Sequence, residues 1–306
     1  MKSKNLAPIV LFVYNRPYHT KQTIEALQKN KLAKDSELFI YSDAPKNIEA
    51  KKSVDEVREF IKNIDGFKKV TVIEREKNWG LANSIIDGVT NIVNRYGKII
   101  VLEDDLVTSP YFLKFMNEAL EFYQNEKRVW HISAWNYPVN IDIKDDVFLW
   151  RVMNCWGWAT WKDRWNFYEK DVDKIISTFS KQEIKRFNLD DTENFWAQVM
   201  GNKDGIINTW AIFWYATIFE NSGLCLNPTR SFIKNIGLDG SGVHCGVQKS
   251  DNLELNLKKD IKYIRKIKEN RKALNSIKKY YLSKKKSLFV RIINKLSRFF
   301  LKRNIL

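Results

Sequence analysis

The first 135 residues alternate between apolar runs and amphipathic segments, and this rhythm constrains the fold more than any other feature. The run PIVLFVY at residues 8–14 is continuously apolar, which is typical of a strand buried on both faces. Similar runs recur at residues 36–43, 68–76, 98–105 and 128–135. Segments with apolar residues at helical spacing separate them, at residues 18–30, 49–64, 81–96 and 110–125. Strands joined by helices predict an α/β fold, a mostly parallel sheet with helices on both faces.

The pattern changes after about residue 145. A segment crowded with tryptophan, DVFLWRVMNCWGWATWKDRWNFY, is followed by helical segments and then by a helix, a turn and a short strand in NTWAIFWYATIFENSGLCLNP. Ten of the 11 tryptophans lie between residues 130 and 214. Most are expected in the core or at its rim, and two or three would contact a ligand.

Three consecutive acids end the fourth predicted strand, in the sequence VLEDDL. Glu103, Asp104 and Asp105 would lie at the carboxyl edge of the sheet, where open α/β sheets bind ligands. Adjacent carboxylates repel one another unless a cation lies between them. A divalent ion such as Mn²⁺ or Mg²⁺, shared with substrate phosphates, would meet this need. Capping of the following helix is the alternative role for these acids.

Other strands end in polar residues at the same predicted edge. Arg16 follows the first strand and offers a guanidinium suited to phosphate or carboxylate. Asp43 ends the second and could accept from a base N–H or a ribose hydroxyl. Such an edge suits a nucleotide diphosphate bound through a metal. The chain has neither a GxGxxG nor a GxxxxGK[ST] motif, so neither a dinucleotide site nor a P-loop is indicated.

Cysteine and histidine contribute little to these predictions. Cys155, Cys225 and Cys245 are far apart and form no CxxC pair, so neither a zinc site nor a disulfide framework is indicated. His131 lies on an apolar strand, where a structural role is expected. The N-terminal apolar run covers about seven residues, too few for a membrane span of about 20 residues.

Several ordered motifs resemble those of GT-A fold glycosyltransferases. They are the strand-ending Arg16, the pair Ser42-Asp43, VLEDDL, HISAWN, LWRVMNCWGWATW, and LNPTRSFIKNIGLDGSGVHCG. Within that fold the chain is most similar to the N-acetylglucosaminyltransferase that begins complex N-glycan assembly, and to related bacterial sugar transferases. The resemblance covers about residues 7–246 and implies transfer of a sugar from a nucleotide donor.

The resemblance also implies roles for individual residues. Asp105 would be the metal ligand, and Glu103 and Asp104 would contact the nucleotide sugar. Asp43 and Arg16 would bind the base and the nucleotide. The implied list is completed by Gly157 and Trp158, which would wall the donor-sugar or acceptor site, and by His244, in a loop that would close over the nucleotide.

The catalytic base is the gap in this resemblance. The similar eukaryotic enzyme inverts configuration and takes its base from a Trp-Asp-Asp-Trp segment. The corresponding place here is NTWAIFW at residues 208–214, which holds no carboxylate. Asp204 and Asp239 are the nearest candidate bases, and another residue or another stereochemical course remains the alternative.

The positive charge of the chain is concentrated at its C-terminal end. Residues 258–306 contain 18 Lys and Arg and 2 Asp and Glu, so they account for the whole net charge of +16. Residues 258–283 are predicted to form one basic helix and residues 284–306 a second. In KSLFVRIINKLSRFFLKR, apolar residues on one face and cations on the other form the pattern of a helix lying in a membrane surface. Docking of this helix on the body is the alternative.

These features divide the chain into three parts. Residues 1–145 would be a nucleotide-sugar-binding half, residues 146–257 the acceptor-binding half of the same catalytic domain, and residues 258–306 a basic helical tail. We expect a metal-dependent hexosyl- or N-acetylhexosaminyltransferase that builds a surface polysaccharide or a lipid-linked glycan. It would be cytoplasmic and peripheral to the inner leaflet.

Two other functions remain open from the sequence. One is a basic membrane- or nucleic-acid-binding protein with a degenerate enzyme body, although no nucleic-acid recognition motif accompanies the tail. The other is a sugar nucleotidyltransferase, which would release pyrophosphate instead of a nucleoside diphosphate.

Overall fold

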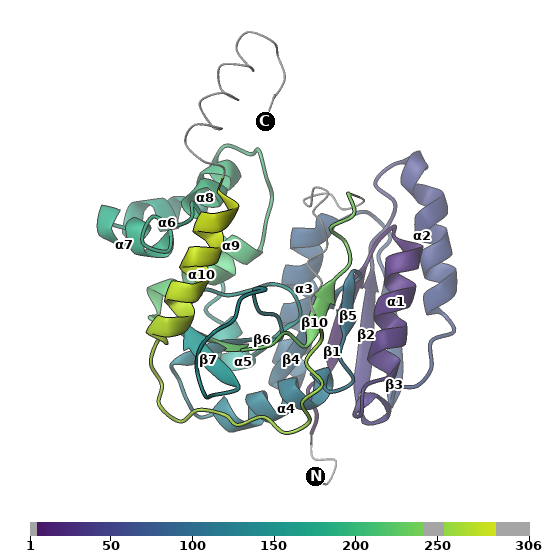
Figure 1. Ribbon diagram of the computed structural model, residues 1–306. Coiled ribbons are helices and arrows are strands. Elements are labelled where there is room, and N and C mark those ends of the chain that lie inside the picture. Colours follow the sequence, from purple (N-terminus) through teal and green to yellow (C-terminus); the bar gives the residue numbers. More distant parts are fainter. Residues whose placement is uncertain (1–4, 241–253, 286–306) are drawn as a thin grey trace.

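The computed structural model describes residues 5–240 and 254–285, and an eight-stranded sheet organises them (Figure 1). Its strands follow the order β3-β2-β1-β4-β8-β6-β9-β7. Their bounds are β1 (Ile9–Val13), β2 (Glu37–Ser42), β3 (Lys69–Glu74), β4 (Lys98–Glu103), β6 (Val129–Ser133), β7 (Val147–Trp150), β8 (Trp158–Trp161) and β9 (Leu224–Pro228). A separate two-stranded sheet pairs β5 (Leu106–Thr108) with β10 (Ile233–Asn235) in antiparallel register.

The five strands predicted in the first half are confirmed, as are the helices between them. These helices are α1 (Pro17–Gln28), α2 (Ile48–Ile61), α3 (Gly80–Tyr96) and α4 (Phe112–Tyr123), with a short 3-10 turn, η1, at Ala33–Asp35. The second half adds α5 (Lys162–Trp165), α6 (Val172–Thr178), α7 (Lys181–Phe187), α8 (Trp196–Lys203), α9 (Ala211–Glu220) and α10 (Arg271–Lys284).

Most strands of the large sheet are parallel, as predicted. Strands β3, β2, β1 and β4 pair in parallel, and so do β6 and β9. Strand β8 runs antiparallel to both β4 and β6, so those two strands point the same way, and β7 is antiparallel to β9. The change of rhythm after residue 145 therefore marks the entry of antiparallel strands into one continuous sheet.

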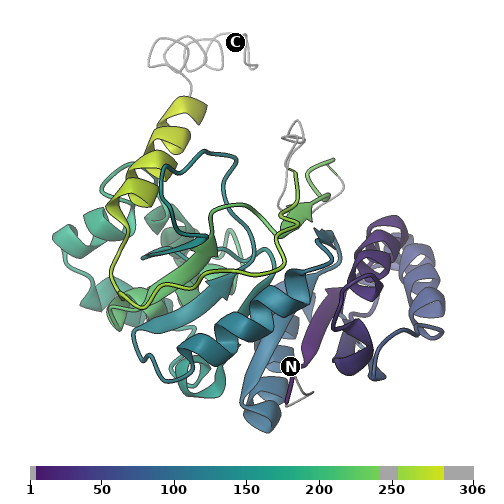
Figure 2. The same cartoon turned by 60° about the horizontal axis from the view of Figure 1, so that its bottom comes forward.

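Helices cover both faces of the sheet because the side chains of each strand alternate between them (Figures 1 and 2). In β1, Val10 and Phe12 pack into a core cluster that also contains residues of α3 and α9. Ile9 and Leu11 of the same strand pack on the opposite face, where α1 and α4 supply the covering residues. This two-sided burial explains why the strands are continuously apolar in sequence.

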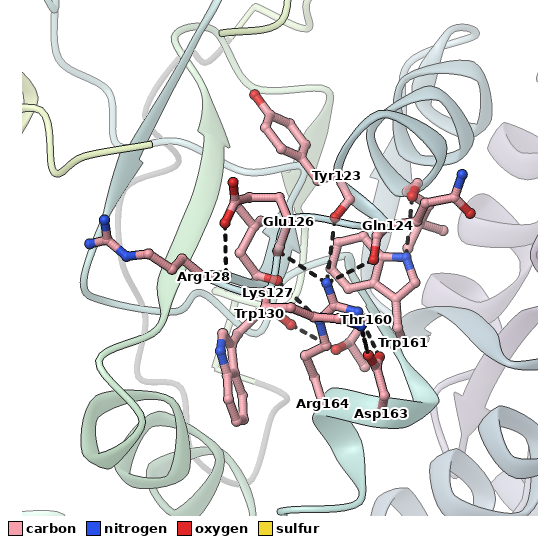
Figure 3. A network of polar contacts seen from close by, with 12 residues as sticks. Tyr123, Gln124, Glu126, Lys127, Arg128, Trp130, Thr160, Trp161, Asp163 and Arg164 are labelled. Atoms are coloured by element: carbon pink, nitrogen blue, oxygen red, sulfur yellow. Dashed lines mark hydrogen bonds and ion pairs between the residues drawn. The ribbon is translucent and has the colours of Figure 1, made fainter. Parts of the chain in front are cut away.

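A buried arginine fixes the edge of the sheet from which β4 starts (Figure 3). Arg164 donates hydrogen bonds to the main-chain oxygens of Gln124 and Glu126, at 3.0 and 3.1 Å, just beyond the end of α4. Its guanidinium also pairs with Asp163 at 2.6 Å and lies over the ring of Trp161. The arginine thus binds main-chain oxygens of the segment that follows α4, and it ties this segment to the end of β8.

The basic segment after residue 258 differs from its prediction. Residues 258–270 are not helical, and the helix begins only at Arg271. The segment runs in extended form along the body because its polar main chain and its apolar side chains both find partners there. Tyr263 packs on Phe115 and its hydroxyl donates to the Phe115 main-chain oxygen, while the Asn270 N–H donates to Leu149. The helix predicted for residues 284–306 lies almost wholly outside the described residues.

Helix α10 itself is docked, with Ala273, Leu274 and Ile277 buried in the core cluster that also contains α9. Within the described ranges 5–240 and 254–285, no helix is both long enough and apolar enough to cross a bilayer.

The docked C-terminal segment leads to a first prediction. Glu269 accepts from the buried Arg151 through both carboxylate oxygens, at 2.7 and 2.6 Å. Replacing Glu269→Ala should lower the free energy of unfolding by about 1–3 kcal/mol, because a charge-assisted pair is lost and the guanidinium stays buried. A fall in melting temperature on thermal unfolding would show it.

Glu254→Ala is the matched control, because its pair with Arg230 is longer, at 3.6 Å, and exposed on both sides. It should change stability by less than about 0.5 kcal/mol. Equal melting temperatures for the two variants would contradict a structural role for the Arg151–Glu269 pair.

Candidate functional site

The predicted ligand edge exists, because β1, β2, β4 and β6 all end on the same side of the sheet. Arg16 follows β1 directly and precedes α1, and Pro17 stands at the start of that helix. The three acids come from the end of β4 and the turn into β5. Parallel pairing of β1 with β4, with Phe12 opposite Glu103, brings these two chain segments together.

Arg16 binds two of the three acids. Its Nη2 atom donates to Asp104 Oδ1 and lies 3.0 Å from Asp105 Oδ2. Thr23 of α1 holds the same turn from below: its hydroxyl donates to the Asp104 main-chain oxygen at 2.8 Å and accepts from the Leu106 N–H at 3.0 Å. The expected gathering of Arg16 with the acids is therefore present, and the acids do not cap the following helix.

One guanidinium does not neutralise three carboxylates in a buried place. Burial, followed by the charges of Asp105 and Asp104, raises the pKa of Glu103 to about 8. Burial likewise raises the pKa of Asp104 to about 6, against the opposing effect of Arg16. Burial opposes the charge of Arg16 itself, but the two aspartates outweigh it and raise its pKa. The cluster holds more negative charge than its own residues can compensate.

Gly237 lets Asp105 and Arg16 lie directly against its main chain. A Cβ atom at this position would lie 2.2 Å from Asp105 Oδ2 and 2.7 Å from Arg16 Nη1, so no larger residue fits without moving them. The glycine follows β10, which pairs with β5, and the Ile236 N–H donates to the Asp105 main-chain oxygen at 2.8 Å. The sequence marked this glycine-rich loop but not its contact with the acids.

The residues present fit a divalent cation held by few protein ligands. In the part of the chain that the structure describes, no group of three or more His, Cys, Asp or Glu side chains is arranged to hold a metal. The raised pKa values of Glu103 and Asp104, which Arg16 does not offset, nevertheless suit an ion bound through a carboxylate at this turn. Such an ion would complete its shell with phosphate oxygens and water, as Mg²⁺ and Mn²⁺ do.

Asp43 lies at the predicted edge, only 7% exposed, and its carboxylate is occupied by main-chain donors. It accepts from the Ala44 and Trp79 N–H groups at 3.0 and 2.9 Å, and from the Gly80 N–H at 2.9 Å. Gly80 is the first residue of α3, so Asp43 stabilises the N-terminus of that helix. Contact with a nucleotide base stays a prediction for this residue.

Trp79 in the turn before α3 is a site feature that the sequence analysis did not single out. The guanidinium of Arg75 lies over its ring at 4.0 Å and over the Tyr41 ring at 5.0 Å, and pairs with Asp87. The Asn78 side chain donates to the Ala44 main-chain oxygen at 2.7 Å. The turn is thus tied to the end of β2. In the sequence, the only indication of this feature was the turn NWG at residues 78–80, which follows a predicted strand.

The two candidate bases occupy different places. Asp239 follows Gly237 by two residues, is half-exposed, and lies 3.1 Å from the His19 Nε2 of α1, which is on the side of the acids. Asp204 is exposed at the C-terminal end of α8. The structure brings Asp239, but not Asp204, into the chain segments that surround Asp105.

Trp158 requires a correction, because it is only 1% exposed. Its ring stacks on Trp210 at 5.1 Å and on His131 at 5.4 Å, so it belongs to the core and offers no open face to a sugar. Gly157, with a φ of +61°, is also buried, and a Cβ there would meet the Ile233 side chain. His244 lies outside the described residues.

His131 has the expected structural role. Its Nδ1 accepts from the Trp214 indole N–H at 3.2 Å, so the proton must sit on Nε2, which donates to the Asn154 main-chain oxygen at 3.0 Å. Burial lowers the pKa of this histidine to about 3, and the ring is neutral. It fixes the loop before β8 at the ligand edge.

Fold and site together define a GT-A protein, a mixed α/β sheet with an acidic cluster at the ligand edge. The profile of the family "Glycosyl transferase family 2" matches residues 9–180, which is more than half of the chain. The chain therefore belongs to glycosyl transferase family 2. This confirms the expected fold and glycosyltransferase class, and it does not extend to the particular N-acetylglucosaminyltransferase similarity.

Solved structures of similar fold include a mannosyltransferase from Pyrobaculum calidifontis in complex with GDP-Man and Mn²⁺, at 9% identity and a TM-score of 0.41. The alignment covers 72% of this chain and 70% of that one. TarS from S. aureus, residues 1–349, matches at 9% identity and a TM-score of 0.40, over 74% of this chain and 59% of that one. A UDP-glucose pyrophosphorylase matches at 11% identity and a TM-score of 0.36, over 73% and 90%. No curated protein matches the chain.

The charge imbalance at Glu103 leads to a second prediction. Because its folded-state pKa of about 8 lies above the ordinary 4.5, the folded protein holds this proton more tightly than the unfolded chain. The resulting stabilisation is fully present below about pH 4.5 and is lost as the pH rises through 8. In EDTA, the melting temperature should therefore fall with pH more steeply in the unsubstituted protein than in Glu103→Gln.

The measurement is the difference in melting temperature between the two proteins at each pH, which removes the contribution of all other titrating groups. Parallel curves across this range would show that the carboxyl of Glu103 titrates normally.

Proposed function

We propose that the protein transfers a hexose or N-acetylhexosamine from a nucleoside-diphosphate donor to a glycan or lipid-linked acceptor in surface polysaccharide synthesis. The observation that carries the proposal is the pairing of Arg16 with Asp104 and Asp105 where β1 and β4 end. A guanidinium and a carboxylate cluster at this edge suit a diphosphate and its counter-ion, and family membership supports the reaction class.

A divalent ion would be held by Asp105, with Glu103 and Asp104 beside it. When bound, Mn²⁺ or Mg²⁺ would act as a Lewis acid that stabilises charge on the departing nucleoside diphosphate. Arg16 would orient the phosphates, since its guanidinium already points at the two aspartates. Gly237 would let Asp105 and Arg16 keep their positions against its main chain, and Asp43 would fix the turn at Trp79 and Gly80.

We propose an inverting course in which a carboxylate takes the proton of the attacking hydroxyl. Asp239 is the better placed of the two candidates, because it is half-exposed near the acids and its side chain is oriented by His19. Asp204 stays the second candidate.

We further propose that the protein works in the cytoplasm at the inner leaflet, attached through its basic C-terminal residues. The support for this location comes from sequence. The sequence of residues 286–303 predicts a helix with apolar residues on one face and cations on the other, and each cation near an anionic leaflet would contribute about 1 kcal/mol.

Replacing Asp105→Asn should weaken the manganese-dependent binding of a nucleoside diphosphate. Isothermal titration with UDP and with GDP, each with Mn²⁺ and with EDTA, would measure it. We expect the affinity gained from Mn²⁺ to fall by on the order of tenfold or more. Gly237→Ala should act in the same direction, because its methyl group would displace the Asp105 carboxylate.

Gly201→Ala is the matched control for the glycine substitution, because its Cβ would meet only the flexible Ile207 side chain, at 3.1 Å. Unchanged manganese-dependent binding in Asp105→Asn would remove the proposed site. The product distinguishes the rival reaction: a transferase releases a nucleoside diphosphate, and a sugar nucleotidyltransferase releases pyrophosphate.

Removal of residues 286–306 should release the protein from vesicles that contain anionic phospholipid. Co-sedimentation with phosphatidylglycerol vesicles and with neutral phosphatidylcholine vesicles would measure binding, and the melting temperature should stay within about 2 °C because the removed residues lie after α10. Continued sedimentation of the shortened protein with the anionic vesicles would place the attachment elsewhere.

A further inference from the structure

A cavity of about 370 Å³ opens among the β7–β8 loop, α8, α9 and α10, and none of the three acids lines it. These helices lie together beside β7 (Figure 1). Its walls include Trp135 and Tyr137 after β6, Asn154 and Trp156 before β8, Gln198 of α8 and Tyr281 of α10. Its volume is at the lower end of the range of about 300–1,000 Å³ that is typical of small-ligand sites.

The cavity belongs to the ligand edge of the sheet. In the pairing of β8 with its neighbours, Trp158 is opposite Val101 of β4 and Ser133 of β6. The loop that ends at Trp158 and the segment that follows Ser133 therefore emerge where β4 delivers its acids. The Ala134 N–H donates to the Gly157 main-chain oxygen at 2.8 Å, which joins the two cavity-lining segments at this edge.

The aromatic walls are held at fixed angles to one another. The rings of Trp135 and Trp156 lie 4.7 Å apart at 78°, and those of Trp135 and Tyr137 lie 4.5 Å apart at 61°. Edge-to-face packing of this kind leaves ring faces turned in different directions. Trp135 and Trp156 are partly exposed, unlike Trp158, so they can pack against the C–H face of a sugar ring.

Polar groups in the wall are suited to hydroxyl groups. The Asn154 Nδ2 atom has no hydrogen-bond partner within the described protein, although it is buried. The loop that carries it is fixed, because its main-chain oxygen accepts from His131. Gln198 adds an exposed amide, and the Tyr137 and Tyr281 hydroxyls lie 2.6 Å apart.

The lack of charged side chains in the described walls limits the class of ligand that the cavity can bind. No Asp, Glu, Lys or Arg is among the described residues that line the cavity, in a chain in which 29% of residues are charged. A carboxylate or phosphate taken into this space would lose water and gain no ion pair, at high cost. An uncharged ring with several hydroxyl groups matches both the aromatic faces and the amides.

We propose that this cavity binds the terminal sugar of the acceptor, and that this sugar is uncharged. The inference rests on the proposed transferase function and adds its acceptor class. Trp135 and Trp156 would stack on the ring, Asn154 and Gln198 would bind its hydroxyls, and Tyr281 makes the C-terminal helix part of the acceptor site.

The test uses the full chain, Mn²⁺, a panel of UDP- and GDP-sugars, and octyl glycosides of neutral hexoses and N-acetylhexosamines, each compared with its octyl uronide. Release of nucleoside diphosphate above the rate of hydrolysis in water reports use of an acceptor, and tryptophan fluorescence reports binding. Neutral glycosides should stimulate release or change the fluorescence, and the uronides should do so at least about tenfold more weakly.

Two variants address the cavity separately. Trp156→Ala removes a stacking face, and Ala211→Phe fills the cavity from the start of α9 without removing a contact. Both substitutions should raise the acceptor KM about tenfold, while the donor KM and the hydrolysis rate stay within about twofold of those of the unsubstituted protein. Trp156→Phe keeps an aromatic face and should have an acceptor KM close to that of the unsubstituted protein. Phe167→Ala, an exposed aromatic outside the cavity, is the control.

The inference is overturned if uronides work as well as neutral glycosides, if both variants leave the acceptor KM unchanged, or if no neutral glycoside changes either signal. These failures are distinguishable from failure of the transferase function, which would appear as loss of manganese-dependent binding of UDP and GDP by the unsubstituted protein.

Discussion

The interaction between Arg16 and the two aspartates after β4 is the constraint on which the rest of the site depends. Two carboxylates can stand side by side in a buried turn only if a cation compensates them, and the raised pKa of Asp104 shows that Arg16 compensates them incompletely. The protein accepts this imbalance at one edge of an otherwise apolar sheet. The neighbouring elements are arranged to support it: Thr23 fixes the turn from α1, and the β5–β10 pair brings Gly237 against Asp105.

The opposite edge of the sheet shows how a buried charge is treated when no ligand is expected. Arg164 is as buried as the acids, but main-chain oxygens and Asp163 satisfy its guanidinium (Figure 3). There the charge stabilises the end of α4 and the position of β8. The two edges of one sheet thus differ in whether their charges are balanced within the protein, and the unbalanced edge is the one suited to a charged ligand.

Much of the fold could be predicted from sequence because the strands of the first half are buried on both faces and the helices between them are amphipathic. The proximity of Arg16 to the acids could be predicted, since residues that follow parallel strands meet at one edge, and their roles in binding stay predictions. The site prediction failed for Trp158, because a tryptophan beside a glycine has the same sequence pattern in the core as at a binding face. The secondary-structure prediction was wrong for residues 258–270, which are extended because contacts with Phe115 and Leu149 override a helical pattern. The role of Gly237 depends on a long-range pairing that no local pattern encodes.

The two halves of the ligand edge differ in chemistry in a way that suits transfer between unlike substrates. Around β1 and β4 the residues are charged and tightly hydrogen-bonded, which favours a diphosphate with its counter-ion. Around the loop before β8 the described walls are aromatic and uncharged, which favours a neutral sugar. Register places these surfaces next to one another, because β8 lies between β4 and β6 and starts where they end. A substrate that reaches both would bring its reactive hydroxyl to the boundary between them, and a base is needed only at that boundary. The described cavity walls contain no carboxylate, so in the proposed inverting reaction the proton acceptor would come from the charged side, where Asp239 lies.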